Sequence, residues 1–154
     1  MKSQRFSLIR LALLALGVLL MNAWAAPLLA GELKLEAILV WGTNDEKSPD
    51  PNHKPVGERL EKKLKKLPFK WAHYFEVSRK KFSLAEGQVE KVELSKECRI
   101  EVRSVGKEAV EVQLFGKGKL VSKISQAMTK DECLVTGGNA PDVTAWFVVL
   151  RQAE

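Results

Sequence analysis

The sequence predicts a mainly β protein, an antiparallel β-sandwich with one short packed α-helix. The first observation is a repeated alternation of apolar and polar residues over 71–128, typical of strands with one buried and one solvated face. The second is a set of short polar or glycine-bearing breaks about 8–12 residues apart, at 86–87, 95–96, 106–107 and 116–118. The third is that only 56–69 has helical periodicity after the N-terminus. The alternative is an α+β sheet covered by that helix.

The first 25 residues predict a signal peptide that is removed on export. An apolar run, LALLALGVLL, lies between three basic residues and the small-residue cleavage site Ala23-Trp24-Ala25, with Ala30 as a second candidate. This run is shorter than the ~20 residues of a membrane helix. We therefore expect a single β-rich domain over 26–154 that does not span a membrane and is periplasmic or secreted.

The basic character of the chain belongs largely to this predicted signal. The chain has 25 Lys and Arg against 19 Asp and Glu, a formal net charge of +6 at pH 7. Removing the three basic residues of the signal leaves 22 against 19. A charge balance this close to neutral gives no electrostatic reason to predict binding to nucleic acid. We therefore expect no nucleic acid among the partners.

Residues 32–41, ELKLEAILVW, predict the first strand, because apolar side chains alternate with charged ones before an apolar run suited to a core. The stretch 42–56 contains three prolines and predicts a long irregular loop. Long loops on rigid scaffolds often carry binding residues. Asp45, Asp50 and His53 are therefore candidate partner contacts, although the spacing of a calcium loop is missing.

Residues 56–69 predict an amphipathic helix. Leu60, Leu64 and Leu67 recur at i, i+4 and i+7, and Pro68 ends the pattern. Such a short helix is not stable alone, so it must pack on a sheet. Two pairs of opposite charge lie four residues apart on it, Glu58 with Lys62 and Glu61 with Lys65.

The rest of the chain predicts strands. Cys98, Ile100 and Val102 are expected to face one way, with charged residues between them facing the other. The apolar segment TAWFVVL, 144–150, is expected to form the last strand, in the middle of a sheet.

Gly137 and Gly138 stand between two strand-like stretches. A phosphate-binding loop needs glycines that lead into a helix N-terminus, and neither of the common glycine-rich phosphate motifs is present. The segment GGNAPD instead has the residues of a turn. We therefore expect the glycine pair to turn the chain into its last strand.

Cys98 and Cys133 are the two cysteines of the chain. Export favours oxidation, and two cysteines allow one intramolecular pairing. The expectation is a disulfide between them, with two small buried thiols as the alternative.

Catalytic and metal sites find little support in the sequence. Nucleophilic catalysis needs a base beside a Ser or Cys, and no signature of a serine or cysteine hydrolase surrounds His53 or His73. The Cys and His residues also lack zinc-finger spacing. We expect no enzymatic activity, no cofactor and no metal.

Basic clusters at 62–66 and 79–81 lie near several aromatic residues. Such a combination can contact an anionic surface, although lysines on a helix are more often simply solvated. The expected partner is an envelope protein or an anionic surface polymer. Trp71 and Tyr74 are candidate contacts, with a place in the core as the alternative for both.

The order LKLEAILVWGTN, LEKKLKKL, FKWAHYFEV and GG…TAWFVVL resembles small exported bacterial β-rich envelope proteins of unassigned function. The resemblance covers nearly the whole mature chain and implies a compact β domain in the envelope, without known catalytic residues. The closing strand, glycine pair and strand also look like the hairpins of outer-membrane secretin channels, which implies a role accessory to secretion.

The function expected from the sequence is that of an exported, non-enzymatic binding module. Its expected surfaces are the 42–56 loop and a strand edge that adds a partner strand. A small secreted inhibitor or an envelope-stress factor is the alternative, and a hydrolase is the least favoured class.

Overall fold

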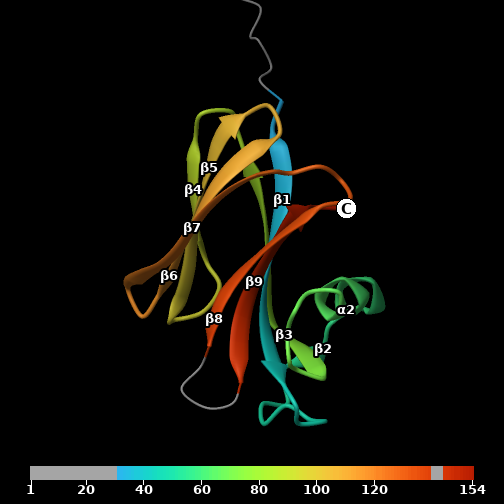
Figure 1. Ribbon diagram of the computed structural model, residues 1–154. Coiled ribbons are helices and arrows are strands. Elements are labelled where there is room, and N and C mark those ends of the chain that lie inside the picture. Colours follow the sequence, from blue (N-terminus) through green and yellow to red (C-terminus); the bar gives the residue numbers. More distant parts are fainter. Residues whose placement is uncertain (1–30, 140–143) are drawn as a thin grey trace, which may run out of the picture. The chain divides into compact units, whose positions relative to one another are not determined.

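A computed structural model describes residues 31–139 and 144–154. The predicted signal peptide lies outside these residues. Two antiparallel sheets and one short helix make up the described part, which confirms the predicted mainly β fold with sandwich-like packing (Figure 1). In chain order, the elements are β1 Leu33–Thr43, β2 Lys54–Pro55, α2 Glu58–Lys65, β3 His73–Leu84, β4 Val89–Glu93, β5 Cys98–Gly106, β6 Ala109–Gly116, β7 Lys119–Ala127, β8 Cys133–Asn139 and β9 Ala145–Gln152.

The five-stranded sheet has the order β2-β3-β1-β9-β8, and the four-stranded sheet has the order β4-β5-β6-β7. The apolar residues that alternate along both sheets meet between them and form the larger core. From the five-stranded sheet come Leu35, Ala37, Leu39, Leu84, Leu134, Val148 and Leu150. From the other side come Val92, Leu94, Cys98, Ile100, Val102, Val110, Val112, Leu114 and Met128.

A second core covers the opposite face of the five-stranded sheet, on the side where Figure 1 shows α2. Leu60 and Leu64 of the helix pack there against the alternate residues of β1 and β9, such as Ile38 and Val149. Both faces of β1 and β9 are therefore buried. This explains why their sequences lose the alternation of a half-exposed strand.

The helix is shorter than the sequence predicts. It ends at Lys65, with Lys66 as the C-cap, so that Leu67 lies beyond it and is 36% exposed. The expectation that Leu67 continues the buried stripe is wrong, because the chain leaves the helical path before the third leucine can face the sheet. Both predicted charge pairs are present, at 2.6 Å for Glu58–Lys62 and 2.7 Å for Glu61–Lys65.

The four predicted breaks all fall at the junctions between strands, with Gly106 as the last residue of β5 and Gly116 as the last residue of β6. In the hairpin that joins β6 to β7, Lys117 has φ 50° and Gly118 has φ 77°. Two successive positive φ values suit the right-handed twist of a two-residue hairpin.

The first strand also agrees with expectation. The 42–56 stretch is more ordered than expected, because β1 extends to Thr43 and Lys54–Pro55 pairs with β3 as an edge strand, where proline is tolerated.

The glycine pair does not form the turn that the sequence suggests. Gly137 and Gly138 lie inside β8, opposite Phe147 and Trp146 of β9. The connection between these strands falls after them in the chain. Gly137 is needed for the close approach of the two strands, because a Cβ there would overlap the main chain of β9, and neither glycine reverses the direction of the chain.

The two cysteines are not bonded to each other, which corrects the predicted disulfide. Cys98 points into the core between the sheets, whereas Cys133 packs on the helix side of the five-stranded sheet. Because side chains alternate along a strand, Leu134 rather than Cys133 faces the core that holds Cys98. A disulfide would need β8 to slip by one residue, which would turn all its side chains to the wrong face.

Thiol labelling of the native protein should distinguish the two cysteines. Burial raises the pKa of the Cys98 thiol to about 11, and the thiolate is the reactive form. We therefore expect a soluble maleimide to modify Cys133 quickly and Cys98 only as the protein unfolds. Intact mass should show one label in native protein and a second in denaturant without reductant. If both cysteines react only after reduction, the predicted disulfide is present after all.

A charged cluster with a buried carboxylate at its centre lies at the other end of the helix-side face. Glu36 of β1 is 1% exposed. One of its carboxylate oxygens accepts a hydrogen bond from Nε of Arg151 at 2.6 Å. A terminal nitrogen of the same guanidinium forms an ion pair with that oxygen, also at 2.6 Å. The other oxygen accepts one from Arg79 at 2.7 Å, and Arg79 also binds Glu76. The cluster ties β1 to its neighbours β3 and β9.

Candidate functional site

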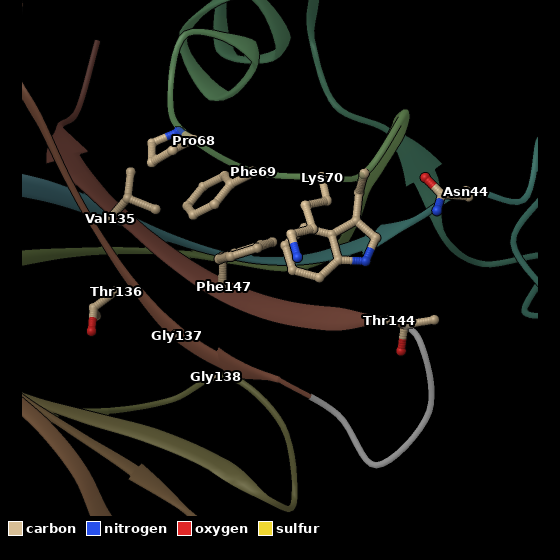
Figure 2. Close-up of a pocket in the computed structure, with 11 residues that line it drawn as sticks. Asn44, Pro68, Phe69, Lys70, Val135, Thr136, Gly137, Gly138, Thr144 and Phe147 are labelled. Carbon is tan, nitrogen blue, oxygen red and sulfur yellow. The ribbon is translucent and has the colours of Figure 1, made fainter.

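A hollow of about 750 Å³ lies on the helix side of the five-stranded sheet (Figure 2). One wall is the segment 68–71, which follows the helix. The other is the stretch 135–138 of β8, and Phe147 of β9 lies between them. The hollow lies where the helix has ended and residues 68–71, which have no regular secondary structure, run towards the start of β3.

Aromatic rings form the base of this hollow. Phe69 stacks on Phe147, with ring centroids 4.4 Å apart. Trp71 meets the edge of Phe147 at 5.5 Å and lies 6.1 Å from Phe69. Gly42 of β1 makes room for them, since a Cβ there would lie 3.0 Å from the Phe147 ring and 3.4 Å from Trp71. The rings leave a partly exposed apolar surface beside β8.

The wall formed by β8 is an open strand edge. Among the described residues, β8 pairs with β9 and has no strand on its other side. The absence of side chains at Gly137 and Gly138 leaves the main chain as the surface of the hollow there. On the opposite face, the hydroxyls of Thr136 and Ser122 of β7 lie 2.6 Å apart and join the two sheets. The edge is thus closed towards the core between the sheets and open towards the hollow.

A second hollow of about 450 Å³ continues along β8 towards its start. It shares Pro68, Phe69 and Val135 with the first hollow and reaches Cys133. We call the two hollows together the β8 groove, bounded by 63–71 on one side and 133–138 on the other. Its length along the strand exceeds that of either hollow alone.

The β8 groove has a basic border. Lys63 and Lys66 line the second hollow and Lys70 lines the first. Of the described residues that line the groove, only Asp131 is acidic. Its carboxylate is 3.4 Å from Arg59, and its main-chain carbonyl accepts a hydrogen bond from Lys63. The local field along the groove is therefore positive.

The predicted loop contacts lie elsewhere. The Ser48 hydroxyl is 2.8 Å from Nδ1 of His53, whose Nε2 is 3.5 Å from Asp50. The order Ser, His, Asp is that of a hydrolase triad, but the two ring nitrogens are exchanged. Ser48 also accepts the N–H of Asp50, and Asp50 accepts that of Asn52. These bonds fold the loop on itself. The Asn52 N–H also helps to lower the pKa of Asp50, and neither hollow of the β8 groove includes these side chains.

The structure brings one of the five candidate contacts into the β8 groove. This residue is Trp71, while Tyr74 is 3% exposed and packs near Phe147, with its pKa raised by burial. Asp45 bonds Thr43 at the start of the loop. The loop meets the groove through Asn44, whose side-chain oxygen accepts the N–H of Ala72 at 3.1 Å. Partner binding by these residues stays a prediction.

Sequence reasoning missed several residues that shape the groove, namely Asn44, Phe69, Lys70, Gly137, Gly138 and Phe147. The basic cluster beside aromatic residues was the usable signal. That signal could not show that β8 pairs with β9. This pairing places a segment from the end of the chain beside residues just after the helix.

Two further observations concern the described residues alone. They contain no group of three or more His, Cys, Asp or Glu side chains placed to hold a metal ion. None of their helices has the length and apolar character needed to cross a membrane.

Comparison of the chain with protein-family models, curated proteins and solved structures found no match.

Proposed function

We propose that this protein is an exported, non-enzymatic interaction module that binds an extended segment of an envelope protein along β8. The observation that carries the proposal is the open edge of β8 beside an aromatic groove. An exposed strand edge offers unpaired N–H and C=O groups, and natural proteins usually cover or blunt such edges. Here, two main-chain positions of the edge lack side chains, which eases the approach of another backbone.

An added strand would use both parts of the groove. Main-chain hydrogen bonds to β8 would supply affinity, and alternate side chains of the partner would supply specificity. Side chains two residues apart point to the same face about 6.6 Å apart along a strand. Neighbouring side chains on the helix side would therefore enter the two hollows that meet at Phe69 and Val135. An apolar side chain there would lie against the aromatic base.

Selection from a random peptide library on the immobilised protein tests this proposal. We expect enriched peptides that bind in extended form. N-methylation of alternate residues should abolish binding for one set of positions and spare the other, because only every second N–H of an added strand faces β8. Equal effects for both sets, or no enrichment at all, would contradict strand addition.

A matched pair of variants locates the site. Val135→Trp fills the centre of the groove from a partly exposed position, and should remove binding. Val89→Trp makes the same change at a 42% exposed position on β4, an edge strand of the other sheet, and should leave binding unchanged. Circular dichroism checks that both variants fold. Binding that survives Val135→Trp would place the site elsewhere.

A further inference from the structure

The lysines of the β8 groove differ from their neighbours on the helix. Lys62 and Lys65 are paired with glutamates of the preceding turn. Lys66 and Lys70 are exposed and have no ion pair with any described residue, and Lys63 bonds only a main-chain carbonyl. The helix thus places its neutralised lysines away from the groove and its unneutralised ones beside it.

These three lysines border the groove along its length. Lys63 and Lys66 flank the hollow beside Cys133, and Lys70 flanks the hollow beside the glycine pair. The aromatic base lies between the two ends. A bound segment therefore meets positive charge at either end and an apolar surface in the middle.

This charge also argues against a second copy of the chain as the occupant. Antiparallel pairing of two β8 edges would extend one sheet and keep the same face of both copies on the same side. The two basic borders would then face each other across the joint and repel. An acidic segment instead gains from the same charges.

We infer that the segment bound along β8 is acidic, with an apolar side chain between its carboxylates. This inference rests on the proposed function and names its partner chemistry. The apolar side chain lies against Phe69 and Phe147, and the carboxylates on either side reach Lys70 and the Lys63–Lys66 pair. Exposed pairs of this kind are screened by salt, so binding weakens as ionic strength rises.

The peptide selection described above tests the charge separately from strand addition. Peptides enriched on the wild-type protein should contain an excess of Asp and Glu around an apolar residue. Replacing those acids with Asn and Gln in one such peptide should weaken binding about tenfold. The triple variant Lys63→Gln, Lys66→Gln, Lys70→Gln should bind the acidic and neutral peptides alike.

A triple variant of equal charge serves as the control. It carries Lys62→Gln, Lys65→Gln and Lys91→Gln, which remove paired lysines outside the groove. It should keep the acidic preference. Loss of the preference in this variant as well would show that only net charge matters, and would overturn the inference.

Other outcomes separate the two proposals. Enriched peptides without acidic excess would overturn the acidic partner and leave strand addition intact, whereas no enriched peptide would remove both. Self-association of the groove triple variant, measured by sedimentation, would assign the lysines to protection of the edge. If polygalacturonate binds the protein and Val135→Trp leaves that binding unchanged, the lysines serve to bind an anionic polymer instead. Either result would overturn the inference.

Discussion

Gly137→Ala is expected to destabilise the protein by about 3 kcal/mol, while Gly138→Ala is expected to be close to neutral. A Cβ at Gly137 would overlap the carbonyl oxygen of Trp146 and lie 2.9 Å from Cα of Phe147. Both are main-chain atoms of the paired strand, so relief requires β8 and β9 to separate. A Cβ at Gly138 would meet only the Trp146 ring, at 3.5 Å, which is an ordinary contact.

Thermal and denaturant unfolding of the two variants measures this difference. For a domain of this size, the Gly137 variant should melt about 10 °C below the wild type. It should also lose peptide binding, because the separated strand borders the β8 groove. The two glycines are adjacent in β8 but differ in what an added Cβ would meet, so each variant is the control of the other. Equal stability of the two would mean that β8 and β9 are not as close as described.

Arg151→Met is expected to cost about 3 kcal/mol at neutral pH. The methionine keeps an apolar stem of similar length but removes the guanidinium that donates a hydrogen bond to Glu36 and forms an ion pair with it. Glu36 is 1% exposed and would retain Arg79 alone. Leaving a buried carboxylate with too few partners costs more free energy of folding than the intact ion pair contributed.

This cost should depend on pH with a definite sign. Burial raises the pKa of Glu36, but hydrogen bonds and attraction from Arg151 and Arg79 outweigh it and hold the pKa below the ordinary value of 4.5. The ionised cluster therefore stabilises the protein above that value and is lost as pH falls through the lowered pKa. Without Arg151 the pKa rises, so the deficit of the variant should shrink from pH 7 to about pH 3.

Urea unfolding of wild type and variant across this range measures the effect. Lys62→Met is the matched control, because its partner Glu58 is exposed and such surface pairs contribute little. Its unfolding free energy should stay near that of the wild type at every pH. A constant deficit for Arg151→Met across the range would mean that the loss comes from packing rather than from the charge of Glu36.

Local patterns predicted the strands well, because a strand with one buried face has apolar residues at every second position of its sequence. The stretch from Cys98 to Val102 follows it, and Ile100 and Val102 do lie in the core between the sheets. The helix was predicted by the same logic. Its end was not, since Leu67 satisfies the helical period but follows the last residue whose main chain is helical.

The errors came from features that depend on pairing between distant strands. Which face of β8 Cys133 occupies is set by its register with β9, and the register places Leu134 in the core with Cys98. The glycine pair resembled a turn because glycine serves both turns and close strands. The candidate site could be predicted only as a basic and aromatic neighbourhood, since its second wall comes from β8.

The pairing of β1 with β9 has a consequence for how the chain folds. It joins Leu35 to Gln152 and Gly42 to Ala145, so strands from opposite ends of the domain lie side by side at the centre of the five-stranded sheet. Closing such distant contacts is slow. Both cores lack the buried residues of β9, such as Val149 and Leu150, until that strand is synthesised, so the fold cannot be completed before the last strand is available.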